Sequence, residues 1–409
     1  MKILIINKYL YNRGGDTTYT FNLGNLLKDN GHQVFYWGMY HQKNIVNNDD
    51  SFPSFIDFNE LNKSKSIRNG VEVLNRSIYS FKIKKQMALF LSETKPDIVH
   101  LNNIHSHLTP SIIDSINNAQ IPIIWTLHDF ELICPNIHFL NNGKVCEDCK
   151  VTKYYMATIN RCKKNSFSAS LMASIKSTAH YSLNIKNKIS SFITPSQFMK
   201  NKFIEYGWPS DKFYHMRNFL PKEKNINNVP FNDDSYIIYF GGLNKWKGVW
   251  TLLKAAKYIK DIKIIFLGEG LERRIMEEYA HNNDIINVSF LGHLSGNELS
   301  SFIAGAEFSI VPSECYENCP FSILESYSFG VPVIGANIGG IPELIENGKT
   351  GFLFKSGDAL ELSEKIKTLY QSPELVDEFS NNAKKFSEDN FSSVQYYNAL
   401  LNIYQTALS

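Results

Sequence analysis

Residues 1–28 read MKILIINKYLYNRGGDTTYTFNLGNLLK. The apolar run from Lys2 to Ile6 has the length of a buried β-strand, and a helical pattern extends from Gly15 to Lys28. Between them the pair Gly14-Gly15 allows a tight turn. A strand, a glycine-containing turn and a helix in this order are typical of the first unit of a parallel sheet.

The alternation of strand-like and helix-like segments continues in two series. The first has strand-like runs at residues 33–37, 97–101 and 121–126, and the second has them at 236–240, 263–267, 287–291 and 308–311, with a helical pattern at 251–259. After residue 351 the pattern is helical to the last residue. The sequence therefore predicts an α/β protein with two doubly wound, Rossmann-like domains.

A polar segment separates the two series. Residues 219–235 contain two prolines and no periodic pattern, as linkers do. We expect a first domain over residues 1–220 and a second over 221–389, with a C-terminal helix, 390–409, whose tyrosines pack back on the first domain. Because open parallel sheets bind ligands outside the carboxyl ends of their strands, we expect the site in the cleft between the domains.

Composition narrows the functional classes. The 409 residues are 43% hydrophobic, and 42 Lys and Arg against 40 Asp and Glu give a net charge of +2, so the chain should be globular and its charge does not favour nucleic acid. Six cysteines are too few for a disulfide scaffold. The N-terminal apolar run is too short for a signal peptide or a membrane span, so we expect a cytoplasmic protein.

Two glycine-containing loops are candidates for binding phosphate. Gly14 and Gly15 precede the first helix, whose free backbone amides attract anions, although such a pair is often only a turn. In the second domain, residues 241–248 read GGLNKWKG, and this loop adds Lys245 and Lys247. Two lysines can neutralise a diphosphate, and the alternative is a solvated loop.

The densest group of functional side chains lies at residues 312–326, which read PSECYENCPFSILES. A helix opening near Asn318 would place free amides beside Glu317, with Glu325 more than one turn further along. Carboxylates usually mark a solvated helix face, but two among Cys, Pro, Phe, Ile and Leu residues are costly unless they have partners. We therefore interpret both acids as ligand-binding groups.

Taken together, these features resemble the retaining glycosyltransferases of family 4, which have the GT-B architecture of two Rossmann-like domains. The resemblance covers nearly the whole chain and rests on Gly14-Gly15, residues 126–129 (TLHD), Lys247-Gly248, the E-x7-E pair Glu317 and Glu325, and residues 339–343 (GGIPE). One departure is Gly242, where such enzymes usually carry an arginine. Lys245 is the nearest substitute for that second cation.

The resemblance implies that Glu317 and His128 lie beside the transferred sugar as catalytic groups and that Glu325 binds the ribose hydroxyls. The other donor contacts would come from loop and backbone groups: Gly14, Gly15, Lys245, Lys247, Asn318, Cys319, Phe321 and Ser322. The implied donor is a nucleotide diphosphate sugar, UDP-linked rather than GDP-linked. We expect the acceptor to be a glycan or lipid-linked glycan of surface polysaccharide synthesis, because residues 149–204 of the N-terminal domain contain no acidic residue and suit a membrane-associated substrate.

The sequence contains no Asp-x-Asp pair, so we expect no metal ion at the departing diphosphate, where helix dipoles and lysine would act instead. The sequence does not distinguish two routes to retention of the anomeric configuration: a covalent intermediate on a carboxylate nucleophile, or attack by the acceptor on the face that the diphosphate leaves. Two rival interpretations also stay open. One is a sugar-nucleotide epimerase or phosphorylase of the same fold, although these lack the E-x7-E pattern; the other is a catalytically silent partner that binds a sugar nucleotide or a membrane.

Four cysteines, Cys134, Cys146, Cys149 and Cys162, form a C-x11-C-x2-C-x12-C pattern just after His128. The C-x2-C pair suits tetrahedral zinc bound by thiolates, and the metal would then be a structural staple. Only one such pair is present and isolated buried cysteines are common, so packing is the alternative. Cys315 and Cys319 are interpreted as packing residues.

The interval from Cys149 to Ile204 contains ten basic residues and no acidic one, interleaved with aromatic and methionine side chains. Such a surface suits an anionic membrane or a lipid diphosphate. Peripheral attachment to the inner face of the cell membrane is therefore one interpretation, and a solvated basic face is the other.

Overall fold

A computed structural model of the chain describes residues 1–47, 49–58, 72–73, 75–221 and 235–409. It divides into two compact units, which we call the N-terminal unit (residues 1–142, 146–216 and 394–409) and the C-terminal unit (residues 143–145 and 217–393). Of the predicted linker, residues 222–234 lie outside the described part of the chain.

The N-terminal unit is built on a six-stranded sheet in the order β2-β1-β3-β4-β7-β8, in which all neighbouring strands are parallel. The strands are β1 (Lys2–Ile6), β2 (Gln33–Trp37), β3 (Ile98–Leu101), β4 (Ile123–Thr126), β7 (Ser191–Thr194) and β8 (Phe213–His215). In chain order this is 2-1-3-4-5-6, the order of flavodoxin-like sheets, whose switch point lies between β1 and β3.

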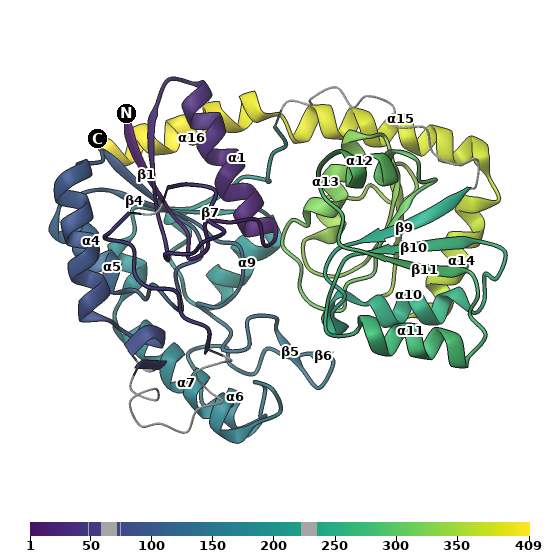
Figure 1. Ribbon diagram of the computed structural model, residues 1–409, viewed down its shortest axis with the longest axis horizontal. Coiled ribbons are helices and arrows are strands. Elements are labelled where there is room, and N and C mark those ends of the chain that lie inside the picture. The colour runs from purple at the N-terminus through teal and green to yellow at the C-terminus, as the bar shows by residue number, and fades with distance from the viewer. Residues whose placement is uncertain (48, 59–71, 74, 222–234) are drawn as a thin grey trace. The chain divides into compact units, whose positions relative to one another are not determined.

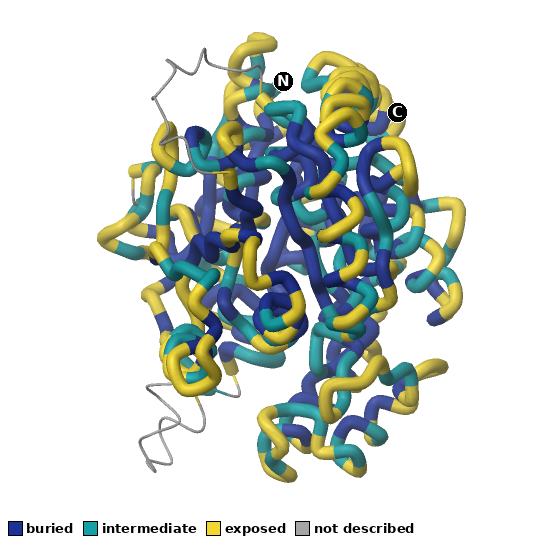
Figure 2. Tube along the Cα trace, turned by 90° about the vertical axis from the view of Figure 1, so that its right-hand side faces the viewer, coloured by how far each residue is buried: buried dark blue, intermediate teal, exposed yellow. Residues whose placement is uncertain are grey.

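Helices cover this sheet, and every residue of β3, β4 and β7 is buried (Figures 1 and 2). The helices are α1 (Gly15–Asp29), α4 (Phe81–Thr94), α5 (Ser111–Asn118), α6 (Met156–Ile159), α7 (Phe167–Ser182), α8 (Ile185–Lys188) and α9 (Gln197–Glu205), followed by the 3-10 turn η1 (Ser210–Lys212). Three of them begin after a serine whose hydroxyl accepts a hydrogen bond from the third helical amide: Ser80, Ser166 and Ser196. Two short strands, β5 (Leu140–Asn141) and β6 (Lys144–Val145), precede α6.

The last helix, α16 (Ser393–Leu408), belongs almost wholly to the N-terminal unit. Tyr404 donates to or accepts from His100 Nδ1 on β3 at 2.6 Å, and Tyr396 lies 2.5 Å from the hydroxyl of Tyr19 on α1. Both Tyr19 and His100 also bond Thr126 Oγ1, at 3.0 and 2.8 Å. A buried polar network therefore holds the C-terminal helix on the first sheet.

The C-terminal unit has a second parallel sheet, in the order β11-β10-β9-β12-β13-β14. The strands are β9 (Tyr236–Phe240), β10 (Lys263–Leu267), β11 (Val288–Gly292), β12 (Ser309–Val311), β13 (Val333–Ala336) and β14 (Gly351–Phe354). In chain order this is 3-2-1-4-5-6, the Rossmann order, whose switch point lies between β9 and β12.

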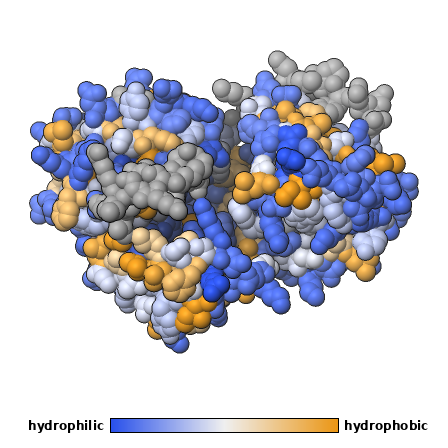
Figure 3. Space-filling view, turned by 60° about the horizontal axis from the view of Figure 1, so that its bottom comes forward, coloured by the Kyte–Doolittle hydropathy of each residue, from blue (hydrophilic) through white to orange (hydrophobic). Residues whose placement is uncertain are grey.

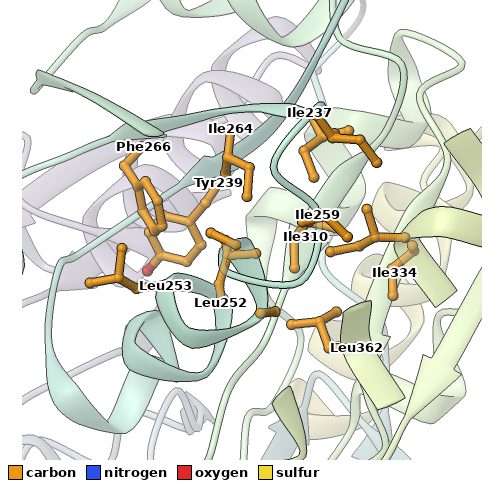
Figure 4. Close-up of a cluster of buried hydrophobic side chains, with 14 of the residues drawn as sticks. Ile237, Tyr239, Leu252, Leu253, Ile259, Ile264, Phe266, Ile310, Ile334 and Leu362 are labelled. Carbon is orange, nitrogen blue, oxygen red and sulfur yellow. The ribbon is translucent and has the colours of Figure 1, made fainter. Parts of the chain in front are cut away.

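Alternating side chains of β9 fill a core on each face of this sheet. Ile237 and Tyr239 meet Leu252 of α10 and Leu362 of α14 on one face (Figure 4), while Ile238 packs in a separate cluster with Ile303 of α12. The helices and 3-10 turns of the unit are η2 (Lys245–Lys247), α10 (Val249–Ala256), α11 (Arg273–Asn282), α12 (Gly296–Ala304), α13 (Phe321–Ser328), η3 (Ile341–Glu343), α14 (Ala359–Tyr370) and α15 (Pro373–Asn390).

Two sequence predictions about this unit are wrong. Residues 351–354, predicted to be helical, form the edge strand β14, because this short apolar run completes the sheet beside β13. The helix predicted to open near Asn318 begins at Phe321, because Pro320 is extended and disfavours a helical conformation at Cys319.

Candidate functional site

The loops after β9 and β12 meet at the switch point of the second sheet and bring Lys247 to Glu317. Lys247 Nζ lies 2.7 Å from Glu317 Oε1, and Ser313 Oγ donates to the same oxygen at 2.8 Å. Burial lowers the pKa of Lys247, but the adjacent Glu317 carboxylate more than offsets this, so the pKa is raised overall. Lys247 is therefore a fixed cation held against a carboxylate.

Two glycines allow this approach. Gly248 has φ +70°, and a Cβ there would lie 1.7 Å from the carbonyl oxygen of Pro312. Gly339 has φ +62°, and its Cβ would lie 2.5 Å from the carbonyl oxygen of Glu317. The amide of Gly340 donates to that same oxygen at 2.8 Å. Only glycine fits either position, so the Lys247-Gly248 and GGIPE segments place the backbone of the two charged residues.

Helix α13 follows Glu317 and begins at Phe321 without a side-chain cap. The backbone amides of Phe321 and Ser322 lie in its first turn, where amides have no partner within the helix and attract anions. Asn318 lies in the loop between Glu317 and this helix, and the carbonyl oxygen of Cys319 accepts a hydrogen bond from Asn218 Nδ2 at 3.2 Å.

Glu325 lies on α13, half-buried, and its carboxylate has no hydrogen bond or ion pair with any residue that the structure describes. Burial raises its pKa to about 7. Partial burial disfavours the charged form of a carboxylate, and hydrogen-bond donors offset this cost. The hydroxyls of a bound ligand would supply the missing donors.

The second predicted cation, Lys245, lies apart from this pair. It is exposed at the start of η2 and forms no ion pair with a described acidic residue. At the neighbouring Gly242, a Cβ would meet only Asn244 Nδ2, at 2.9 Å, and this is the end of a side chain that can move. The loop could therefore accept a larger residue at 242.

In the N-terminal unit, His128 follows β4, half-buried, and packs edge-on against Tyr19 at 4.8 Å between ring centroids. Its Nε2 lies 2.8 Å from Asn102 Oδ1, an arrangement that places the proton on Nε2 and leaves Nδ1 as an acceptor. Burial is the main reason that the pKa of His128 is lowered to about 4. The ring is therefore neutral at pH 7.

The Gly14-Gly15 turn begins α1, as predicted, but some of the backbone amides of this turn already donate hydrogen bonds within the protein. Thr17 Oγ1 accepts hydrogen bonds from the amides of Arg13 and Gly14 at 3.0 and 3.1 Å. The carboxylate of Asp16, in the first turn of the helix, accepts from Asn103 Nδ2 at 2.9 Å. Of the two glycines, Gly15 is therefore the better candidate for binding an anion.

A charged cluster beside His128 was missed at the level of sequence. Glu131 is buried, paired with Lys176 Nζ, and accepts from Ser106 Oγ at 3.0 Å. His105 Nε2 lies 3.5 Å from Asp129 Oδ1. Burial raises the pKa of Glu131, but nearby positive charges, Lys176 first, together more than offset this and hold the pKa well below its usual range.

The signal for this cluster was present in the sequence. Segments rich in polar residues follow the carboxyl ends of β3 and β4: NNIHSH at 102–107 directly after β3, and HDFE at 128–131 one residue after β4. Polar side chains that follow adjacent parallel strands gather at one edge of the sheet, where such folds bind ligands.

Comparisons with known proteins agree with this arrangement of two sheets. A family model described as "Glycosyl transferases group 1" matches residues 221–386, and one described as "Glycosyltransferase Family 4" matches residues 13–224, more than half of the chain. The chain belongs to glycosyltransferase family 4. The predicted resemblance to this family is thereby confirmed.

Curated relatives of the glycosyltransferase are distant. A sulfoquinovosyl transferase of Arabidopsis thaliana is 31% identical over 155 residues, which is 37% of this chain and 30% of that protein. A capsular polysaccharide biosynthesis glycosyltransferase of Staphylococcus aureus is 26% identical over 82% of this chain and 86% of its own length. An N-acetyl-alpha-D-glucosaminyl L-malate synthase of Bacillus anthracis is 23% identical over 97% and 94%.

Solved structures of similar fold extend over the whole chain. An Anabaena protein, HepE, crystallised with UDP-glucose, has a TM-score of 0.66 at 17% identity and covers 99% of this chain and 100% of its own. A sucrose-phosphate synthase of Thermosynechococcus elongatus has a TM-score of 0.70 at 17% identity, with 99% and 98% covered. These likenesses confirm the predicted fold: the chain is a glycosyltransferase of GT-B type.

The predicted basic surface of the glycosyltransferase is smaller than its sequence suggests. Lys176 is buried against Glu131, so its assignment to an exposed face is wrong. Other lysines of the interval pair with acids elsewhere in the chain: Lys150 with Glu205, Lys188 with Asp114, and Lys202 with Glu147 and Glu205. These acidic partners lie outside residues 149–204, so the absence of acidic residues within that interval does not show that its lysines are unpaired.

Exposed apolar side chains, by contrast, are concentrated on α6, α7 and the turns beside them. Phe167, Leu171 and Ile175 follow one another at intervals of four residues on α7 and are 58%, 41% and 46% exposed. Val151, Tyr155 and Ile159 are also exposed. We call these six residues the α6–α7 surface. Figure 3, which brings the lower side of Figure 1 forward, shows hydrophobic side chains gathered at its lower left.

Among the helices of the described residues, none is both long enough and apolar enough to cross a bilayer.

Proposed function

We propose that this glycosyltransferase moves a sugar from a UDP-sugar to a glycan or lipid-linked acceptor of surface polysaccharide synthesis, with retention of the anomeric configuration. The E-x7-E resemblance supports retention. The solved neighbour crystallised with UDP-glucose supports the donor, and the capsular polysaccharide relative supports the class of product.

The observation that carries the proposal is the juxtaposition of a cation, a carboxylate and an uncapped helix in the C-terminal unit. Lys247 lies 2.7 Å from Glu317, and α13 begins four residues after Glu317. We assign the donor diphosphate to Lys247 and the amides of Asn318, Cys319, Phe321 and Ser322, and the ribose hydroxyls to Glu325. Glu317 would then lie beside the transferred sugar.

The chemistry follows from these charges. When the bond between the anomeric carbon and the diphosphate breaks, negative charge develops on the leaving oxygen, and a fixed ammonium with helix amides stabilises it without reorganising. We therefore propose that the transfer step needs no metal ion. In same-face attack, the proton of the acceptor hydroxyl passes to the departing diphosphate oxygen. The neutral His128, with Nδ1 as an acceptor, can bind a hydroxyl of the sugar or the acceptor.

The test begins with binding. Titration calorimetry with UDP, GDP and ADP should give the strongest binding for UDP, and UDP-sugars should then be turned over on lipid-linked glycans in excess EDTA, with product anomers read by NMR. Lys245→Ala should weaken UDP binding if Lys245 is the second cation, whereas Lys260→Ala should not. Absence of UDP and GDP binding at millimolar concentration would overturn the donor assignment.

For the acceptor, we propose a membrane-associated substrate reached through the α6–α7 surface. Exposed apolar side chains with basic neighbours, here Lys153, Arg161 and Lys164, have the composition of interfacial segments that lie on anionic lipid. Each such cation adds about 1 kcal/mol of attraction near an anionic membrane. Attachment should therefore be peripheral and weaken as salt rises.

Co-sedimentation with vesicles of phosphatidylglycerol and phosphatidylcholine tests this. The wild type should pellet at low salt, and Leu171→Glu with Ile175→Glu should abolish pelleting. Ile286→Glu, which changes an equally apolar and 90% exposed residue of the C-terminal unit, should not. A wild type that stays in the supernatant at low salt would favour a soluble acceptor. The donor assignment does not depend on this outcome, because UDP binding is measured separately.

A further inference from the structure

The four cysteines that follow His128 in the sequence gather around one cavity of the N-terminal unit. The cavity has a volume of about 10 Å³ and is lined by Cys134, Cys146, Cys149 and Cys162, together with Pro135, Asn136, Phe139, Leu140 and Ala157. None of the four thiols is in a disulfide. A space that barely holds one water molecule, surrounded by four sulfur ligands, has the size and chemistry for a single ion.

The segment that carries these cysteines has only a small buried cluster of its own, although Phe139 also packs on Phe130 and Tyr206 and polar contacts join it to Ser174 and Lys202. Its own buried cluster consists of Cys149, Tyr154 and Ala157, with Met156 and Cys162 packed against them. Among the described non-glycine residues with positive φ, eight of fourteen fall between Cys134 and Ser166, namely Ile137, Phe139, Asn142, Val151, Thr152, Arg161, Lys164 and Asn165. Left-handed conformations cost about 1 kcal/mol or more each and persist where the surroundings enforce them.

We propose that Cys134, Cys146, Cys149 and Cys162 bind a structural zinc ion. The ligand set is the four-cysteine type of closed structural sites, in which each thiol loses its proton to solvent and the thiolate binds the metal at about 2.3 Å. The ion would tie the chain at four points between β4 and α7, and so brace the α6–α7 surface.

A competing cation site is weaker. Among the described residues, the group whose ligand atoms already lie within 4.8 Å of one another is His105, Asp129 and Glu131. The Lys176 ammonium contacts Glu131 there and already supplies the positive charge. The thiols of the cysteine cavity are not drawn together to that spacing, so binding requires their side chains to turn inward.

The test uses the full chain, expressed in zinc-supplemented medium and purified without chelators. Elemental analysis should find about one zinc ion per chain. Cys149→Ser should retain less than about a tenth of that zinc, since it removes one of four ligands. Cys315→Ser, which changes a buried cysteine of the C-terminal unit, is the matched control and should retain all of it.

A second measurement needs no variant. Removing the metal from the wild type with a strong chelator should lower the unfolding temperature, and added zinc should restore it. Cobalt in its place should give the absorption bands of tetrahedral thiolate coordination. A wild type that carries less than about a tenth of an equivalent of zinc, a Cys149→Ser variant that keeps its zinc, or disulfides among these cysteines under reducing purification would each overturn the proposal.

Discussion

At the scale of single residues, the contact between Lys247 and Glu317 has two consequences. Each charge satisfies the other, at 2.7 Å, while no donor is bound. A diphosphate that binds Lys247 must therefore compete with Glu317 for the ammonium. The carboxylate that is proposed to act on the sugar is also one that weakens the binding of the leaving group.

Replacing Glu317 by glutamine separates these two effects. The substitution keeps the shape of the side chain and frees the ammonium of Lys247, so we expect UDP affinity to be unchanged or higher. Transfer should fall by about 100-fold or more, as for other groups that act on the transition state. Calorimetry measures the first and initial rates the second. Equal, small losses in both Glu317→Gln and Glu325→Gln would instead indicate that neither acid acts on the donor or the transition state.

Glu325 predicts a pH dependence of donor binding. Its pKa is raised to about 7 by burial, and only the carboxylate accepts hydrogen bonds from both ribose hydroxyls. Between pH 8 and pH 6 the ionised fraction falls about tenfold, so affinity for a UDP-sugar should fall by about the same factor. A UDP-sugar is the right probe because its diphosphate diester keeps its charge in this range.

The control for this prediction is Glu325→Gln, which cannot titrate. Its affinity should be lower than that of the wild type at pH 8, and it should change little with pH. A wild type whose affinity is constant from pH 6 to pH 8 would show that Glu325 does not bind the donor as a carboxylate.

At the scale of elements, sequence patterns located β1 to β4 and β9 to β12, because each is a short apolar run closed by polar or glycine residues, but they did not predict β7, β8 or β13. The sequence also misassigned β14: the run GFLF at residues 351–354 was predicted to be part of a helix, although it is a short apolar run of the same kind. Periodic patterns do not predict side-chain contacts between residues that are far apart in the sequence. The burial of Lys176 depends on Glu131, 45 residues away, and the contact of Lys247 with Glu317 spans 70 residues. The resemblance, rather than periodicity, brought the latter two together.

The GGIPE segment allows a prediction about its first glycine. Gly339→Ala combines a left-handed conformation with a Cβ 2.5 Å from the Glu317 carbonyl oxygen, so it should displace Glu317 and remove most activity. Gly348→Ala is the matched control, since Gly348 has φ +79° but no atom within 4 Å of its Cβ. The control should cost about 1 kcal/mol of stability with little change in rate. Equal losses of activity would show that the contact with Glu317 is unimportant.

At the scale of the whole molecule, the two units differ in their buried titratable groups. The pKa values of His100, His107 and His180 are each lowered to about 3, chiefly by burial, and all three lie in the N-terminal unit. In the C-terminal unit, Glu325 has a pKa raised to about 7. Acidification therefore acts on the units with opposite signs.

The sign for each unit follows from proton binding. Between pH 6.5 and pH 3 an unfolded histidine is protonated, whereas these three native histidines stay neutral. The free energy of unfolding of the N-terminal unit therefore falls as the pH falls, by up to about 1.4 kcal/mol per histidine and pH unit. Native Glu325 keeps its proton up to about pH 7, whereas the unfolded side chain releases it near its ordinary pKa of 4.5. The C-terminal unit therefore gains stability as the pH falls from about 7 to about 4.5.

We therefore expect the N-terminal unit to open first when the pH is lowered from 7.5 to 5. Hydrogen exchange followed by mass spectrometry, corrected for the intrinsic pH dependence of exchange, reports the opening free energy of each unit separately. The value for the N-terminal sheet should fall by several kcal/mol while that for the C-terminal sheet stays level or rises. His180→Gln, which can still donate to the carbonyl oxygens of Ser77 and Ile78, should remove part of the pH dependence. His281→Gln, at the end of α11, should leave it unchanged, and parallel losses in both sheets would contradict the assignment of opposite signs.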